Sequence, residues 1–492
     1  MRELILSIDQ GTTGTTALFL EKDVTVAAKH NVEFPNHYPK PGWVEHDLNE
    51  IWTSVEHAVQ GAISRLGEAP FKIVAIGITN QRETCVFWDA ATGEPIHRAL
   101  VWQDRRTAQY CLDLKEKGLE SDIKKRTGLV LDPYFSGTKA QWLLDNVDGA
   151  RERAQKGEIL FGTIDTYLIW KLSGAHVTDP SNASRTLLFN INTMRWDPVL
   201  LELLKIPDSV LPNIVDNAQV VGHTSGISFL EDGIPVAGIA GDQQSALFGQ
   251  ACFSSGSAKC TYGTGAFLLM NTGSEPVPSN NGLLTTVAWR LNGEVTYALE
   301  GSAFIAGAAV QWLRDGLELI PSAPDIEKLA ESVDNSNGVC FVPALAGLGA
   351  PHWKPEARGI LSGITGGTHK GHVAYAVLEG VAMQIVDILE AMSSDSGQEL
   401  SVLKVDGGMA NNNLMMQIQS DLLKTSCHRP QVLETTALGA AFLAGLGVGF
   451  WSSTEAITEA WCLDRQFFPQ ALDEDVSERR RMWNKAIQRA SF

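Results

Sequence analysis

The sequence predicts an α/β protein with two large domains. Its 492 residues exceed what one hydrophobic core usually holds. Two segments share the order of an apolar strand, a turn rich in threonine and glycine, and another apolar strand: ILSIDQGTTGTTALFL near the N-terminus and SAKCTYGTGAFLLMNTG from Ser257 onward. A repeat of this kind predicts a duplication with one similar unit in each half. We therefore expect one domain over residues 1–250 and a second over residues 251–492.

Strands and helices alternate in the order expected of this class. Residues 3–34 predict three strands joined by turns, and residues 72–89 predict two strands around a polar turn. The segment IPVAGIAGDQQSALFGQ predicts a buried strand ending at Gly241 and Asp242, followed by a helix from Gln243. Further along, LKVDGGMANNNLMMQIQSDLL predicts a strand, a glycine turn and an amphipathic helix.

Composition excludes several classes of partner. Hydrophobic residues make up 44 % and charged residues 20 %, which is ordinary globular usage, and the net charge of −18 argues against nucleic acid and anionic lipid as partners. The seven cysteines contain no C-x-x-C pair, so a disulfide framework and a zinc site are not expected, and a reducing cytoplasm fits. MRELILSIDQ is too polar for a signal peptide.

One apolar stretch and one short motif have simple interpretations. TALGAAFLAGLGVGF, residues 436–450, is too short to span a membrane and is rich in small residues, which predicts a buried core helix and no membrane insertion. Asn182 begins NAS, which matches a glycosylation acceptor, and we interpret this as a chance match.

The two threonine-rich turns are candidate phosphate sites. Their backbone N–H groups and hydroxyls can meet an anion. The first turn offers Thr12, Thr13 and Gly14, and the second offers Gly263, Thr264 and Gly265. Each turn alone is also ordinary hairpin chemistry. Taken together, they predict a polyphosphate held between the domains.

A third glycine cluster, VDGGMANNN, extends this prediction. The asparagines 411–413 could face an adenine or a ribose, or they could cap the following helix. The chain contains no Walker A sequence, no G-x-G-x-x-G and no protein-kinase catalytic loop. A bound nucleotide would therefore use a different architecture.

The chain contains the motifs IDQGTTGTT, NQRET, VWQDRR, DPYFSGTK, GIAGDQQSALFGQ, TYGTGAFLLMNTG, LEGSAFIAGAAVQWLRD, GLGAPHWKPEARG and VDGGMANNN. Taken together, these motifs resemble the FGGY family of carbohydrate kinases over nearly the whole chain, and within it the members that act on glycerol. The resemblance implies a two-domain actin-like (ribonuclease H-like) ATPase fold. Each domain would be a mixed sheet flanked by helices, with a catalytic cleft between the domains.

The resemblance also implies a polyol site with Asp242 as the catalytic base. Glycerol has three hydroxyls and little apolar surface, so an arginine fork and carboxylates suit it better than an apolar pocket. Without the resemblance, Arg82 and Glu83 would be interpreted as a solvated pair and Trp102 as core. The implied substrate residues are Arg82, Glu83, Trp102, Tyr134, Asp242, Gln243 and Phe267.

ATP and Mg²⁺ are the implied cofactors. Asp9, at the end of the first strand, would hold Mg²⁺ through water. The implied contacts to ATP are Thr12, Thr13, Gly14, Gly263 and Thr264 at the phosphates and Gly307, Gln311, Gly408 and Asn412 at the adenosine.

The expected reaction is the ATP-dependent phosphorylation of glycerol to sn-glycerol 3-phosphate by a cytoplasmic homo-oligomer, a dimer or tetramer. Two alternatives remain: a kinase for another short polyol or dihydroxyacetone, and a non-catalytic nucleotide-binding regulator. The chain departs from the family pattern at Thr16, where an arginine is usual, and at His352 and Lys354, where tyrosine and aspartate are common. GHTSGISFLEDGIP lacks the basic residues with which some members bind a sugar bisphosphate.

Overall fold

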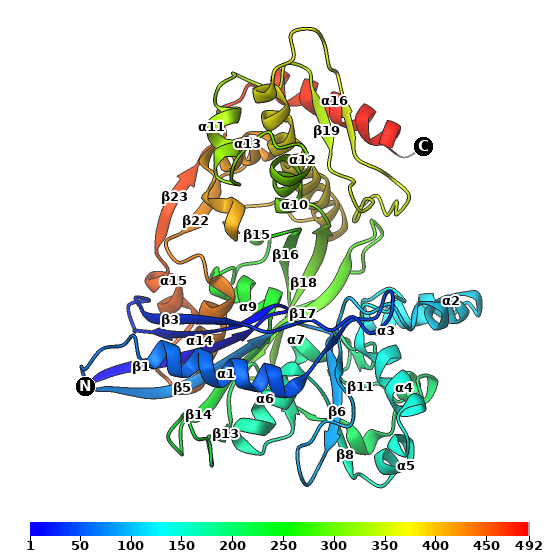
Figure 1. The fold of residues 1–492 in the computed structure, drawn as a ribbon, viewed down its shortest axis with the longest axis vertical. Helices are drawn as coiled ribbons and strands as arrows, with labels where there is room; N and C mark the ends of the chain where they lie inside the picture. Colours follow the sequence, from blue (N-terminus) through cyan, green and yellow to red (C-terminus); the bar gives the residue numbers. More distant parts are fainter. Residues whose placement is uncertain (491–492) are drawn as a thin grey trace.

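Two β-sheets of similar construction organise the chain in the computed structural model, which describes residues 1–490 (Figure 1). The N-terminal sheet has six strands in the order β13-β14-β5-β1-β2-β3. Strands β1, β5 and β14 are mutually parallel, and the other three run antiparallel to their neighbours. The bounds are β1 (Arg2–Gln10), β2 (Gly14–Leu20), β3 (Val26–Glu33), β5 (Phe71–Asn80), β13 (Ala218–His223) and β14 (Pro235–Gly241).

The C-terminal sheet has seven strands in the order β17-β18-β16-β15-β21-β22-β23. Strands β15, β21 and β22 are parallel, and the remaining pairs are antiparallel. The bounds are β15 (Ala258–Tyr262), β16 (Ala266–Gly273), β17 (Leu284–Leu291), β18 (Glu294–Ala303), β21 (Leu403–Asp406), β22 (Cys427–Pro430) and β23 (Leu463–Phe467).

The two sheets repeat one pattern of six strands. Each contains an antiparallel hairpin, β1–β2 or β15–β16, with a third antiparallel strand, β3 or β18, beside its second strand. Two parallel strands follow on the other side, β5 and β14 or β21 and β22, and an antiparallel strand, β13 or β23, completes the set. This correspondence supports the predicted duplication.

Helices and smaller sheets surround these two sheets. A four-stranded sheet in the order β4-β7-β6-β8 joins β4 (Glu45–His46), β7 (Ala99–Leu100), β6 (Cys85–Asp89) and β8 (Ile159–Thr163). Three two-stranded sheets pair β9 (Val177–Thr178) with β12 (Asn213–Ile214), β10 (Phe189–Asn190) with β11 (Arg195–Trp196), and β19 (Cys340–Val342) with β20 (Ile360–Ser362). The α-helices are α1 (Leu48–Ile63), α2 (Ala108–Glu116), α3 (Glu120–Thr127), α4 (Ser136–Asn146), α5 (Ala150–Gln155), α6 (Ile164–Ser173), α7 (Pro180–Ala183), α8 (Pro198–Leu203), α9 (Asp242–Gly249), α10 (Gly307–Gln311), α11 (Asp325–Ala330), α12 (Lys370–Ser396), α13 (Asn413–Leu423), α14 (Thr435–Gly447), α15 (Thr454–Ala460) and α16 (Asp473–Ala490), and the single turns are η1 (Asp208–Val210), η2 (Trp312–Gly316) and η3 (Gly408–Asn411).

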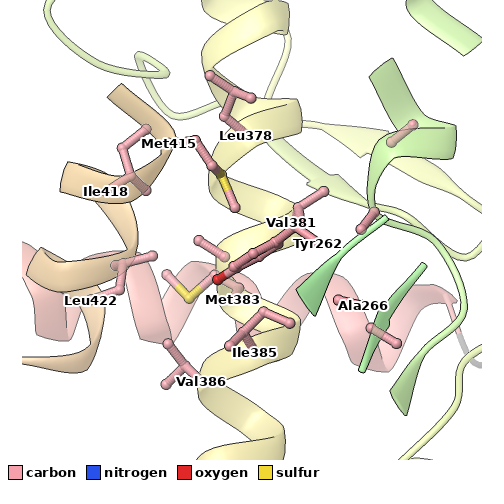
Figure 2. Packing of buried hydrophobic residues seen from close by; sticks show 14 of the residues in the cluster. Tyr262, Ala266, Leu378, Val381, Met383, Ile385, Val386, Met415, Ile418 and Leu422 are labelled. Atoms are coloured by element: carbon pink, nitrogen blue, oxygen red, sulfur yellow. The ribbon is translucent and has the colours of Figure 1, made fainter. Parts of the chain in front are cut away.

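The C-terminal core is centred on helix α12. Figure 2 shows Tyr262 of β15 lying beside this helix, with Met415, Ile418 and Leu422 of α13 on the other side. The Tyr262 hydroxyl donates to Gln419 Oε1 at 2.7 Å, so its buried polar end has a partner. Within the described residues α12 is the one helix long and apolar enough to cross a membrane, and 94 % of its apolar window is buried inside the fold. That burial is typical of a helix at the centre of a core.

Helix α14, the predicted core helix, packs against the N-terminal sheet although it comes late in the chain. A Cβ on Gly77 of β5 would lie 2.1 Å from the Ala440 oxygen, and one on Gly238 of β14 would lie 2.3 Å from the Ala444 nitrogen. The small residues therefore allow direct backbone contact between helix and sheet. The predicted division at residue 250 stays a prediction, and α14 shows that the chain returns to the N-terminal half.

Gly77→Ala should lower the free energy of unfolding by about 1–3 kcal/mol, because the added methyl group meets helix backbone that cannot rotate away. Chemical denaturation would measure the change. Gly366→Ala is the matched control, since nothing lies within 4 Å of its added Cβ. Equal stability of the two variants would show that α14 does not pack this closely.

Candidate active site and nucleotide cavity

Three parallel strands end at one edge of the N-terminal sheet and bring the predicted catalytic residues there. Asp9 lies near the end of β1, and Asp242 directly follows β14. Between them, β5 leads into the polar turn that carries Arg82 and Glu83. Ligands of open α/β sheets bind at the carboxyl ends of such strands. The structure therefore brings together at one edge residues that lie far apart in the sequence.

Arg82 is the centre of a buried charge cluster. Its Nε lies 3.0 Å from Asp242 Oδ1 and 3.9 Å from Glu83 Oε1, and its Nη1 lies 2.5 Å from Glu300 Oε2. Burial by itself lowers the pKa of Arg82, but the carboxylates of Glu300 and Glu83 outweigh burial and hold that pKa well above its usual value. The interpretation of Arg82 and Glu83 as a solvated pair is wrong, since both side chains are 2 % exposed.

Asp242 retains access to the open side of this cluster, with its side chain 31 % exposed. Helix α9 begins at Asp242, one residue earlier than predicted, so Gly241 and not Asp242 occupies the N-cap position. Asp242 Oδ1 accepts the backbone N–H of Gln243 at 2.6 Å. A Cβ on Gly241 would lie 2.7 Å from Arg82 Cγ. Glycine at this position therefore lets the arginine stem pack beside the end of the strand.

Glu83 is held in an unusual conformation. Its backbone φ is 61°, in the left-handed region that non-glycine residues seldom occupy. Its Oε1 accepts from Arg185 Nε at 2.6 Å. Burial raises the pKa of Glu83, although the charges of Arg82 and Arg185 oppose the rise. Strained residues of this kind gather at functional sites.

Aromatic side chains form a wall beside the charges. Trp102 and Tyr134 meet edge to face, with ring centroids 5.6 Å apart and planes at 77°. Trp102 Nε1 donates to Thr12 Oγ1 at 2.9 Å, which links this wall to the first threonine-rich turn. The half-buried ring of Phe267 comes from β16 in the other sheet.

Asp9 and Asp242 are two carboxyl groups that lie close enough to interact electrostatically. Burial, followed by the charge of Asp242, raises the pKa of Asp9 to about 7. A cation would relieve this repulsion, and Mg²⁺ prefers few carboxylates with several waters. Within residues 1–490, no three or more His, Cys, Asp or Glu side chains are grouped to hold a metal. The residues present therefore fit a cation held partly by oxygens other than those of the protein.

Gln243 has a partner in the other sheet. Its Oε1 accepts from Nζ of the fully buried Lys259, which also donates to Thr261 Oγ1 at 2.9 Å. Burial lowers the pKa of Lys259, against the opposing charge of Asp406. Lys259 therefore links α9 of the N-terminal half to the C-terminal sheet.

Each of the two threonine-rich turns is closed by a backbone hydrogen bond between two glycines. Gly11 N donates to Gly14 O at 2.9 Å in the first turn, and Gly263 N donates to Gly265 O at 2.8 Å in the second. The second turn also contacts the start of α10, where Gly307 N donates to Gly263 O at 2.9 Å. The repeated hairpins thus share their strand order, but the first turn is one residue longer than the second.

A cavity of about 390 Å³ opens beside the second turn. Gly263, Thr264, Gly307, Gln311, Gly408 and Asn412, the residues predicted for the C-terminal side of the nucleotide, all line it. Arg314 and Glu327 line it as well. Asn412 also caps α13, since its Oδ1 accepts Met415 N at 2.8 Å, so the capping alternative is present in the structure. Thr12, Thr13 and Gly14 do not line this cavity.

Sequence reasoning missed the residues that join the two halves at this site. Glu300 and Arg185 belong to the Arg82 cluster, and Lys259 and Asp406 lie beside Gln243 and Thr261. Glu300 lies in LEGSAF, the beginning of one of the motifs that resemble the family, and Arg185 directly follows NAS. An isolated charge inside a strand that otherwise looks buried is the signal that could have identified Glu300 and Lys259.

The positions that depart from the family pattern have structural partners. Thr16 lies opposite Asp9 on β2, and its Oγ1 accepts from Asn31 Nδ2 at 2.9 Å. His352 Nε2 lies 2.8 Å from Asp387 Oδ2 on α12. The backbone of Lys354 exchanges hydrogen bonds with Leu348, and its carbonyl oxygen also accepts from Ala357 N. Asn182 is fully buried in α7, which fits the interpretation of NAS as a chance match.

Comparison with known proteins defines the class. Residues 4–249 match the N-terminal domain and residues 258–448 match the C-terminal domain of the FGGY family of carbohydrate kinases. The chain belongs to this family, as the motifs predicted. The two-domain actin-like α/β fold class is likewise confirmed.

Within this family, the chain is similar to several glycerol kinases. The chain is 57 % identical over 491 residues to glycerol kinase of Myxococcus xanthus (strain DK1622), covering 99 % of each chain. It is 56 % identical over 490 residues to glycerol kinase of Deinococcus radiodurans, covering 99 % of this chain and 97 % of that protein. The crystal structure of Plasmodium falciparum glycerol kinase with ADP matches with a TM-score of 0.95 at 39 % identity, covering 100 % and 99 % of the two chains.

Replacing Asp242 by asparagine should lower the pKa of Asp9 in metal-free protein, because a negative neighbour then becomes neutral. Carbon-detected NMR titration of labelled aspartate would follow the Asp9 carboxyl carbon, which should titrate near about 7 in the unaltered chain. Asp208→Asn, a surface change, is the control. An Asp9 titration that is identical in all three proteins would contradict the electrostatic coupling.

Proposed function

We propose that the chain transfers the γ-phosphoryl group of ATP to glycerol and forms sn-glycerol 3-phosphate. The observation that carries this proposal is the polar cluster around Arg82, which combines a buried arginine fork with carboxylates and has one partly exposed aspartate, Asp242. Such a set suits a small polyol, because each hydroxyl needs a donor or an acceptor. The similarity to several glycerol kinases over nearly the full length supports the choice of substrate.

In this proposal the polyol lies between the charge cluster and the aromatic wall. Arg82 would donate to a hydroxyl oxygen, and Glu83 and Asp242 would accept hydroxyl protons. Trp102 and Phe267 would cover the carbon chain, while Tyr134 and Gln243 would supply further polar contacts. Such fixed partners select for hydroxyl position, because an analogue lacking one hydroxyl leaves a buried group unpaired.

Asp242 would act as the base. It would accept the proton of the 3-hydroxyl as that oxygen forms its bond to the γ-phosphorus, while the bond from that phosphorus to the oxygen bridging to the β-phosphate breaks and ADP leaves. Nε of Arg82, 3.0 Å from Asp242 Oδ1, would help to orient this carboxylate. Phosphoryl transfer has a loose transition state, so orientation of the hydroxyl matters as much as the basicity of the carboxylate.

The nucleotide would occupy the cavity lined by Gly307, Gln311, Gly408 and Asn412. Its phosphates would reach Gly263 and Thr264 on one side and Thr12, Thr13 and Gly14 on the other. Asp9 would hold Mg²⁺ through water, and the bound ion would neutralise phosphate charge.

The cellular setting forms part of the same proposal. The chain would work in the cytoplasm as a homo-oligomer, a dimer or a tetramer. The seven cysteines, all in the described part of the chain, are free, which suits a reducing compartment.

A coupled assay of ADP release tests the proposal directly. It would compare glycerol with dihydroxyacetone and with other short polyols at matched concentrations. The highest kcat/KM should belong to glycerol. A higher value for another compound would replace the substrate, and ATP binding without turnover on any of them would favour the non-catalytic alternative.

Asp242→Asn should lower kcat by about 100-fold or more while nucleotide binding and folding remain, because the amide keeps the shape but cannot accept the proton. Steady-state kinetics, nucleotide titration and thermal unfolding would separate these effects. Asp208→Asn is the matched surface control. Near-normal turnover of Asp242→Asn would remove this residue from the mechanism.

A further inference from the structure

Glu300 joins the two halves of the chain behind the polyol site. It lies on β18 of the C-terminal sheet and is 3 % exposed, whereas Arg82 and Arg185 belong to the N-terminal half. Its Oε2 accepts from Arg82 Nη1 at 2.5 Å. Its Oε1 accepts from Nη2 of Arg82 at 3.1 Å and from Nη2 of Arg185 at 2.9 Å. One buried carboxylate therefore holds two buried guanidinium groups.

This contact determines which atom of Arg82 faces the base. Both Nη groups of Arg82 are engaged with Glu300, and Nη1 is also 3.2 Å from Gln244 Oε1. Nε of Arg82 lies 3.0 Å from Asp242 Oδ1. Without Glu300, the guanidinium fork would be free to bind Asp242 through two nitrogens, as arginine and carboxylate groups prefer. That arrangement would occupy the oxygens that a substrate hydroxyl needs.

Arg185 links Glu300 to Glu83, because its guanidinium group contacts both carboxylates. Its Nε donates to Glu83 Oε1 at 2.6 Å, and its guanidinium stacks 5.3 Å from the Phe135 ring and 5.9 Å from the Tyr134 ring. None of residues 1–490 donates a hydrogen bond to Glu83 Oε2, so this oxygen is left as an acceptor. Glu300 and Arg185 thus orient one carboxylate oxygen inward and leave the other for a ligand.

Glu300 is the buried carboxylate that Arg82 and Arg185 share, and these two guanidinium groups keep it ionised. Burial raises its pKa, but Arg185 and Arg82 more than offset burial and bring that pKa to about 2. Removing the charge of Glu300 would leave the Nη2 groups of Arg82 and Arg185 without the buried carboxylate that they share, which these side chains can relieve only by moving.

We propose that Glu300 is a positioning residue of the polyol site that the C-terminal half supplies. It orders Arg82 directly and Glu83 through Arg185, and it does not itself touch the substrate. This inference rests on the proposed function, since it assigns the residue to the glycerol side of the reaction. The polyol site is then complete only when β18 is docked against the N-terminal half.

Glu300→Gln tests the proposal in the full-length protein. The glycerol KM should rise by about tenfold or more, while the ATP KM changes by less than about twofold. Propane-1,2-diol and propane-1,3-diol, which each lack one hydroxyl of glycerol, should be affected less than glycerol. The preference for glycerol, measured as a ratio of kcat/KM values, should therefore fall, whereas a merely structural loss would leave that ratio unchanged.

Two further variants serve as controls. Glu300→Asp keeps the charge on a shorter side chain, so it should fold when Glu300→Gln does not and should show an intermediate glycerol KM. Glu379→Gln removes another buried glutamate, whose Oε1 lies 3.3 Å from Arg479 Nη1 in the C-terminal half. It should match Glu300→Gln in any loss of thermal stability but keep the glycerol KM and the substrate ratio.

An unchanged substrate ratio in the folded Glu300 variants would overturn the proposal, as would equal rises of the glycerol and ATP KM values. If the wild-type chain turns over a different polyol in place of glycerol, the proposed function fails on its own. The same KM comparison with that polyol then decides the role of Glu300.

Discussion

A buried charge must be paired, and this constraint shapes the centre of the molecule. Arg82 cannot remain buried without carboxylates around it. One is the neighbouring Glu83, and the other two come from distant parts of the chain: Asp242 after β14 and Glu300 on β18. The ion pairs therefore require the N-terminal sheet and the C-terminal sheet to meet at this place. Assembly of the cluster therefore depends on the contact between the two halves.

Three features of the surrounding fold make this cluster possible. Parallel strands deliver Asp9 and Asp242 to one sheet edge, and Gly241 gives Arg82 room to pass. Helix α14 returns from the C-terminal segment and packs on the N-terminal sheet through Gly77 and Gly238. The cavity proposed for the nucleotide is lined by residues of the second half, next to the second threonine-rich turn. A phosphoryl donor and a polyol acceptor can then approach from opposite halves, which is the arrangement that we propose.

Local patterns in the sequence were sufficient for much of the fold. The strand–turn–strand order of the first 33 residues, the strand before Asp242 and the helix after Asn412 follow from hydrophobic periodicity and turn residues, and all are present. The six residues of the second half that were predicted to contact the nucleotide all line one cavity. These six residues were implied by the resemblance to the family. The spacing of the glycines alone was equally compatible with ordinary structural turns.

The parts that could not be predicted depend on tertiary contacts. Glu300 and Lys259 are single charges in strands that otherwise look buried, and only the packing of the two halves reveals their partners. The N-cap at Gly241 and the left-handed φ of Glu83 depend on how Arg82 packs, which no local pattern records. Likewise, the apolar stretch 436–450 predicted a buried core helix. That this helix packs against the N-terminal sheet is visible only in the structure.

A crystal structure of the chain with glycerol and a non-hydrolysable ATP analogue would test the central claim most directly. It should show glycerol against Arg82, Glu83 and Asp242, adenine in the cavity beside Gly408, and the γ-phosphate between the two threonine-rich turns within reach of the 3-hydroxyl. Adenine bound outside that cavity, or glycerol bound away from Arg82 at saturating concentration, would contradict the account of one site shared by two halves.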